Sequence, residues 1–194
     1  MVHESTVVTV ADAKAWSEWL RDHVDRGEGI WLVLANKGSV GATTLTYDEA
    51  LDEAICHGWV DGQLAKGDEG AYRRRFTRRR PDSAWSKRNV AIVERLLAEG
   101  RMRPAGLMAV ERAKANGHWD RAYASSATAE VPSDLAAALQ ANPPAKAMFE
   151  CLSSADRYSV IYRVTTVARA VTRQRRIEQL VAMLARGETI HPRR

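Results

Sequence analysis

The sequence predicts an α+β protein, in which a small mixed or antiparallel sheet flanked by helices is followed by an all-α C-terminal helical subdomain. Short apolar runs typical of strands alternate with helical patterns in the first part of the chain, and only helical patterns follow. A polar segment of small residues, 124–130, separates the two parts. We therefore expect an α+β domain at residues 1–125 and a helical subdomain at residues 131–190.

The first two elements are a helix and a strand. Trp16 and Leu20 lie one helical turn apart within residues 8–23, and Asp12 can act as a helix start signal. The apolar run at residues 29–35 is rich in strand-forming side chains. We expect a helix over the first range and a buried strand over the second.

A second helix follows a loop. Residues 36–43 contain two glycines and a serine, which are typical of loops. Thr46 and Glu49 have the spacing of a capping box, in which each residue hydrogen-bonds the backbone of the other. The helix that they begin ends at the glycine-flanked segment 57–62, where we expect the chain to turn into a strand or a tight loop.

The remaining elements of the first domain lie between residues 66 and 116. Residues 66–70 predict a turn, and the alternation in 71–78 predicts a strand. A helix is expected at 84–100, opened by the Pro-Asp-Ser sequence at 81–83. A further helix begins at Pro104 and ends near residue 116.

The C-terminal part reads as three helices. Their expected ranges are 133–141, 144–169 and 172–186, and the middle helix is expected to break near Ser153. No internal repeat accompanies these patterns.

Several classes of protein are disfavoured by composition and motifs. The two cysteines, Cys56 and Cys151, match no metal or redox spacing, and we expect both to be buried free thiols. Glycine-rich phosphate loops and paired metal ligands are absent, so we expect no cofactor and no metal. The N-terminal residues do not resemble a signal peptide, and no apolar stretch approaches the ~20 residues that span a bilayer. These observations predict a cytoplasmic protein without a membrane association.

Positive charge is concentrated in one block, residues 72–103. The block holds eleven Lys and Arg residues and three acidic residues, whereas the whole chain has a net charge of only +5. The rest of the chain is therefore slightly acidic. A local positive field of this kind attracts phosphate, carboxylate or nucleic acid.

The segment 57–62, His-Gly-Trp-Val-Asp-Gly, allows two interpretations. Trp59 can be a stacking surface with Asp61 as an acceptor or general base. Alternatively, Trp59 packs in the core and Asp61 pairs with an arginine from the basic block. His57 is a second candidate catalytic residue, because an unperturbed histidine pKa of about 6.5 suits proton transfer; a structural role is the alternative.

The arginines of the basic block must divide between two faces. Alternate strand residues share a face, so Arg73 and Arg75 point one way and Arg74 the other, and at least one arginine is expected near Asp61. A helix start at Ser83, flanked by Arg79 and Arg80, can form an anion site; alternatively, Ser83 simply caps the helix. The candidate ligand-binding residues are Trp59, Arg75, Arg79, Arg80, Ser83, Trp85, Ser86 and Asn89.

Four segments, 57–62, 76–89, 99–106 and 117–123, resemble the YdeI/OmpD-associated family, whose members are described as bacteriocin-protection proteins. The resemblance extends over essentially the whole chain, including the helical part. It implies an association with tolerance of antibacterial compounds, without a defined reaction. The chain departs from the family pattern at His57, where an aromatic residue is usual, and at Arg78, where a proline is usual.

Three functional hypotheses follow. The leading one is an intracellular small-molecule-binding protein that handles, or confers resistance to, an antibacterial or secondary metabolite, with an anionic or aromatic ligand. The second is an enzyme acting on a small metabolite with His57 or Asp61 as general base. The third is nucleic-acid binding through residues 72–103, which the slightly acidic remainder and the lack of a reader motif disfavour. No pattern indicates an oligomeric state.

Overall fold

The computed structural model describes residues 6–190 except positions 25, 37, 40, 68, 69 and 127. Parts of the expected loop at 36–43 and turn at 66–70, and the N-terminal residues 1–5, therefore lie outside the described residues. The α+β prediction is confirmed, because a four-stranded sheet is followed by a region of helices only. The chain forms two compact units, each described by itself below: residues up to Ser83 with Asn89–Trp119, and Ala84–Arg88 with the residues from Asp120 onward.

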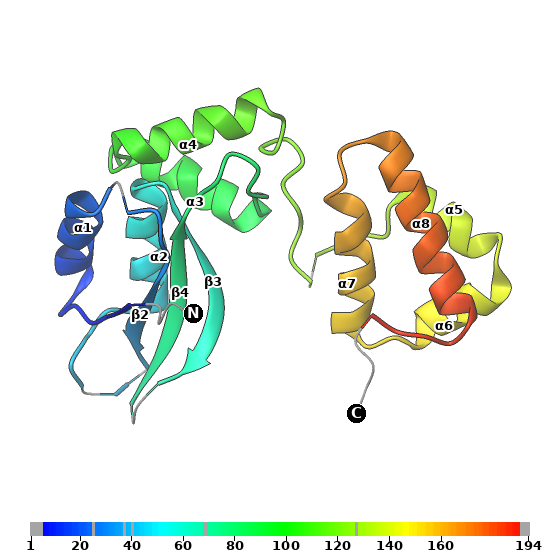
Figure 1. Cartoon of the computed structure of the whole chain (residues 1–194), viewed down its shortest axis with the longest axis horizontal. Helices are drawn as coiled ribbons and strands as arrows, with labels where there is room; N and C mark the ends of the chain where they lie inside the picture. Colours follow the sequence, from blue (N-terminus) through cyan, green and yellow to red (C-terminus); the bar gives the residue numbers. More distant parts are fainter. Residues whose placement is uncertain are drawn as a thin grey trace. The chain divides into compact units, whose positions relative to one another are not determined.

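The sheet of the first unit is mixed. Its strands lie in the order β1 (Val7–Val8), β2 (Ile30–Ala35), β4 (Ala71–Arg78) and β3 (Trp59–Lys66). β1 pairs parallel to β2, whereas β4 pairs antiparallel to both of its neighbours (Figure 1). Of the two alternatives for segment 57–62, the structure has the strand.

Helices α1 (Ala13–Asp22) and α2 (Tyr47–Cys56) begin at the expected signals. The Asp12 side chain accepts the Ala15 N–H at 2.9 Å, and Thr46 forms the expected capping box. The prediction that the first helix starts at residue 8 is wrong, because Val8 is already paired in the sheet. Pairing with β2 satisfies backbone N–H and C=O groups that would otherwise need hydrogen bonds within a helix.

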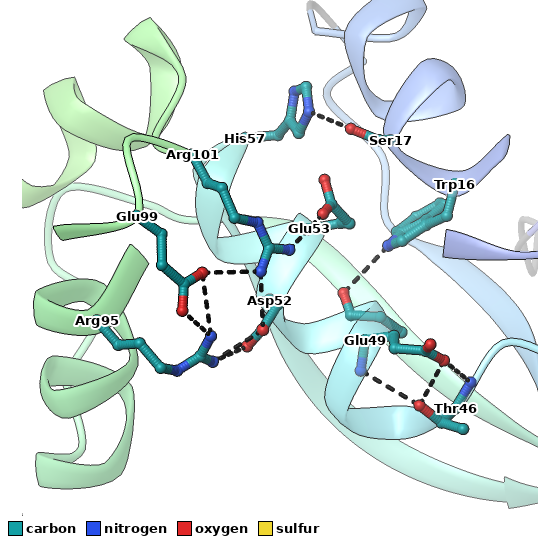
Figure 2. A network of polar contacts seen from close by, with 11 residues as sticks. Trp16, Ser17, Thr46, Glu49, Asp52, Glu53, His57, Arg95, Glu99 and Arg101 are labelled. Carbon is teal, nitrogen blue, oxygen red and sulfur yellow. Dashed lines mark hydrogen bonds and ion pairs between the residues drawn. The ribbon is translucent and has the colours of Figure 1, made fainter. Parts of the chain in front are cut away.

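These two helices cover one face of the sheet. Trp16 is fully buried between them, and its indole N–H donates to the Ala50 carbonyl at 3.1 Å (Figure 2). The core that they form with the sheet contains Trp16, Leu20, Ile30, Leu32, Leu34, Leu45, Ala50, Ala54, Trp59 and Phe76. Burial of this many large apolar side chains is the main stabilising contribution to the unit.

Helix α3 (Lys87–Ala98), from Asn89 onward, and helix α4 (Pro104–Ala115) belong to the first unit. The predicted start of α3 at residue 84 is wrong by three residues. Ser86 instead bridges to Tyr123 in a parallel pairing, and the Tyr123 N–H donates to the Trp85 carbonyl at 2.9 Å. This pairing explains why Ala84–Arg88 belongs to the second unit.

The second unit contains α5 (Ser133–Gln140), α6 (Pro143–Cys151), α7 (Ser154–Thr165) and α8 (Ala170–Ala185). The expected break in the middle helix is confirmed, because Ser153 caps α7 by accepting the Asp156 N–H at 3.1 Å. The core of the unit consists of Leu135, Leu139, Ala145, Phe149, Leu152, Val160, Ile161, Val164, Ile177, Leu180, Val181 and Leu184.

Candidate anion-binding pocket

Arginine side chains gather around a cavity of about 780 Å³ in the first unit, which we call the arginine pocket. Five arginines line it, and Glu28 is the acidic residue among the lining side chains. The lining residues are Gly27, Glu28, Gly29, Arg75, Thr77, Arg78, Arg79, Arg80, Pro81, Ser83 and Arg112. The excess of cations gives the pocket a positive local charge, which attracts anions.

Strand β4 divides its arginines between the two faces of the sheet, as the alternation predicts. Arg74 lies on the side of α2, where it contacts Asp61 and Tyr47. Arg75 and Thr77 lie on the other side and line the arginine pocket. Trp31 of β2 is the register partner of Arg75. The strand therefore provides one arginine to the interior and others to the pocket.

Gly29, immediately before β2, leaves room for this arrangement. A Cβ atom at Gly29 would clash with the Thr77 Cγ2 atom, and it would lie 3.0 Å from the Phe76 carbonyl oxygen and 3.2 Å from the Arg75 Nε atom. The wall of the pocket therefore depends on the absence of a side chain at Gly29. Any larger residue there would displace the Thr77 and Arg75 side chains.

A tight turn after β4 holds the next two arginines. The Arg79 N–H donates to the Gly58 carbonyl at 2.9 Å, which extends the pairing of β4 and β3 beyond the strand ends. The Arg80 N–H then donates to the Ser83 side-chain oxygen at 2.9 Å, and the Ser83 N–H donates back to the Arg80 carbonyl at 3.0 Å. Ser83 thus closes a turn instead of capping α3, which begins at Lys87.

Arg112 reaches the pocket from α4. The side chain of Asn116, at the end of this helix, donates to the Pro81 carbonyl at 2.6 Å and so joins the helix end to the turn. Sequence reasoning missed Arg112, because no local pattern relates a residue of α4 to a strand some thirty positions earlier. Thr77 was also missed, although its two-residue spacing from Arg75 indicates a shared face.

Asp61 has an ion-pair partner inside the first unit. One of its carboxylate oxygens accepts the Tyr47 hydroxyl at 2.8 Å and an Arg74 N–H at 2.9 Å. The Arg74 guanidinium also lies 4.5 Å from the centre of the Tyr47 ring. The prediction that an arginine approaches Asp61 is confirmed, and this carboxylate is not among the groups that line the arginine pocket.

Neither of the candidate tryptophans, Trp59 and Trp85, lines the arginine pocket. Trp59 is 0% exposed and packs edge-on against Trp19 at 5.9 Å between ring centres. This position matches the structural interpretation of the motif and leaves no ring surface for stacking. Trp85 is also buried, and with Ser86 it belongs to the second unit. Asn89 is buried in the first turn of α3.

His57 lies at the end of α2, in a different cavity of about 600 Å³. Its Nε2 atom forms a hydrogen bond of 3.1 Å with the Ser17 hydroxyl (Figure 2). Burial is the main reason that the pKa of His57 is lowered; Glu53 opposes this effect, and Arg103 reinforces it. His57 and Asp61, the two candidate catalytic residues, therefore have separate partners.

Other candidate chemistries find little support among the described residues. Over this part of the chain, no three His, Cys, Asp or Glu side chains are grouped to hold a metal ion. Both cysteines are free as expected, but Cys151 is exposed, which corrects the prediction that both are buried. Burial raises the pKa of Cys56 to about 12, so its thiol stays protonated at neutral pH. None of the described helices combines the length and apolar character that a membrane crossing needs.

Comparison with known families divides the chain in two. Residues 8–109 match the model of a domain of unknown function, DUF8412, over slightly more than half of the chain. The chain belongs to this family. Four arginines of the pocket lie in the DUF8412 segment, and only Arg112 lies beyond it.

The second match falls on the helical unit. Residues 128–187 match the model of the family described as Bacteriocin-protection, YdeI or OmpD-Associated, which confirms the resemblance inferred from the sequence for this segment and implies a role related to bacteriocin protection. The motif segments at 57–62, 76–89 and 99–106 lie instead in the part that matches DUF8412. Searches of curated proteins and of solved structures found no match.

Proposed function

We propose that the DUF8412 unit binds a small molecule carrying a carboxylate or phosphate group, and that this binding serves the role related to bacteriocin protection. The observation that carries the proposal is the arginine pocket, in which five arginines face one cavity with a single acidic residue. The planar guanidinium group can donate two parallel hydrogen bonds to a carboxylate or phosphate, which suits it to this task.

The size and shape of the pocket favour a small ligand. A volume of about 780 Å³ falls within the range of roughly 300–1,000 Å³ that is usual for small-molecule sites. The arginines gather around one cavity instead of following a stripe along a helix or sheet, which disfavours the nucleic-acid alternative. The enzyme alternative has no comparable support, since His57 and Asp61 lie outside this pocket.

Phosphate and acetate titrations of the full chain, followed by isothermal calorimetry, test the proposal. We expect saturable binding of at least one of the two anions. Arg80→Ala or Arg112→Ala should weaken it by about tenfold, because each removes a charge-assisted hydrogen-bond donor. Both side chains are exposed, so the variants should fold normally. The anion that binds more tightly indicates whether the pocket prefers a phosphate or a carboxylate group.

Arg73→Ala is the matched control. Arg73 belongs to β4, the strand that carries Arg75 and Arg78 of the pocket, and it has the same charge as the tested arginines, but it is not among the residues that line the pocket. It should retain nearly full affinity. Equal losses in Arg73→Ala and Arg112→Ala would mean a general charge effect, and the absence of saturable binding in the unmodified chain would refute the proposal.

A further inference from the structure

We propose that the second unit holds a separate site for planar, uncharged aromatic molecules. The site is a cavity of about 860 Å³ whose lining includes Tyr123, Tyr158 and Tyr162; we call it the tyrosine pocket. All of its lining residues belong to the second unit. The proposal does not depend on the arginine pocket, which lies entirely in the first unit.

The three rings form a contiguous aromatic wall. The Tyr123 and Tyr162 rings meet edge to face, with centres 4.9 Å apart and planes at 86°. The Tyr158 ring lies 6.0 Å from Tyr162 at 45°. All three residues are only half-buried, so part of each ring remains accessible. Rings set at different angles offer both faces and edges to a planar guest, which are the two favoured geometries of aromatic contact.

Hydrogen bonds anchor two of the three tyrosines, Tyr158 through its hydroxyl and Tyr123 through its backbone. The Tyr158 hydroxyl donates to the Ala124 carbonyl at 3.0 Å and thereby joins α7 to the segment that precedes α5. Tyr123 is held on both sides of its peptide unit, because its N–H donates to the Trp85 carbonyl and its carbonyl accepts the Lys87 N–H, each at 2.9 Å. A site that is already ordered loses little entropy when it binds a ligand.

The charges around the cavity favour a ligand without net charge. Arg173 is neutralised by a two-pronged ion pair with Asp134, with distances of 2.6 and 2.9 Å. Among the other lining residues, two cations are balanced by two acidic residues, Asp120 and Glu130. The arginine pocket has no such balance, so the two sites should select ligands of different chemistry.

The position of the cavity connects it to the helical family domain. Tyr158, Tyr162 and the chain segment 128–133 lie within residues 128–187, which match the bacteriocin-protection family model. Tyr123 lies just before this range. An aromatic site here would give the helical unit a binding role of its own, in addition to that of the DUF8412 unit.

The test is an NMR titration of the ¹⁵N-labelled full chain with indole, a planar uncharged probe. We expect saturable shifts of backbone amide signals from the segments 121–133 and 158–168. Tyr162→Leu should weaken indole binding by about tenfold, since it removes the central ring of the wall. Tyr72→Leu is the control, because Tyr72 is a partly buried tyrosine of the first unit. Cyclohexanol, which is apolar but not aromatic, should bind at least tenfold more weakly than indole.

Two further measurements keep the result interpretable. Tyr158→Phe retains the ring and loses only the hydroxyl bond to Ala124, so it should bind indole within about threefold of the unmodified chain. The amide spectrum of Tyr162→Leu shows directly whether the helical unit is folded. Shifts confined to other segments, equal affinity in Tyr162→Leu, or equal binding of cyclohexanol would each overturn the proposal. Loss of phosphate binding at the arginine pocket would leave it unaffected.

Discussion

His57 shows how a single side chain depends on the surfaces that enclose it. The residue ends α2, and its ring lies against α1, where it contacts Ser17. Burial lowers its pKa below the ordinary value of 6.5, so the imidazole is neutral at pH 7. A neutral, hydrogen-bonded histidine at this position is consistent with a structural role, and proton transfer remains a prediction.

The lowered pKa of His57 predicts a loss of stability in acid. Below pH 6.5 the unfolded chain takes up a proton on His57 while the folded chain resists it, so the free energy of unfolding should fall as the pH decreases from 7 to 5. His57→Gln removes this contribution. Urea unfolding at pH 8 measures the packing loss alone, and the difference between the two proteins should narrow toward pH 5. A difference that stays constant between pH 8 and pH 5 would contradict the prediction.

At the scale of elements, ion pairs join α2 to α3 and to the turn that follows it (Figure 2). Arg95 of α3 donates to both carboxylate oxygens of Asp52, at 2.7 and 2.8 Å. Arg101, after the helix, donates to Glu53 at 2.6 Å and to Glu99 at 3.1 Å. Because one guanidinium connects acidic groups from two elements, the network fixes where α3 ends relative to α2.

Removing Arg101 should loosen this connection. Arg101→Ala leaves the partly buried Glu53 carboxylate without its cation, and we expect the free energy of unfolding to fall by about 1–2 kcal/mol. Arg186→Ala is the control, because Arg186 pairs with the exposed Glu188. That variant should change stability by less than about 0.5 kcal/mol. Similar losses in the two variants, measured by urea unfolding, would show that the network adds nothing beyond a surface pair.

At the scale of the whole molecule, each unit has a hydrophobic core of its own. In the second unit, Arg173 of α8 joins three elements, since it pairs with Asp134 of α5 and donates to the Val164 carbonyl of α7 at 2.8 Å. Asp134 supplies the negative charge from within the chain.

Separate cores predict that damage to one unit stays local. Arg173→Ala should lower the stability of the second unit by about 1–2 kcal/mol, because it removes three charge-assisted hydrogen bonds at once. Hydrogen exchange followed by mass spectrometry should show faster exchange in peptides from residues 133–185. Peptides from α1, α2 and the sheet should be unchanged. Equal acceleration in both units would indicate one cooperative molecule instead.

Local signals in the sequence determined most of the elements and three of the helix starts. Asp12, Thr46 and Ser153 each begin a helix because their side chains bond a backbone N–H three positions later. The alternation in β4 likewise separates Arg74 from Arg75, because successive strand side chains point to opposite faces. These effects act over a few residues, so the sequence by itself was sufficient for them and for the α+β class.

Only the tertiary structure decided which side chains share a site. Arg112 of α4 joins Arg75 and Arg80 at the arginine pocket, whereas Trp59 faces the core and Trp85 pairs through its backbone with Tyr123. No pattern of short range relates these positions, because each contact closes a long loop between separate elements. Sheet register and helix packing select such contacts through the total burial that they allow. The local sequence therefore specified the arginines, and the fold selected the ones that form a pocket.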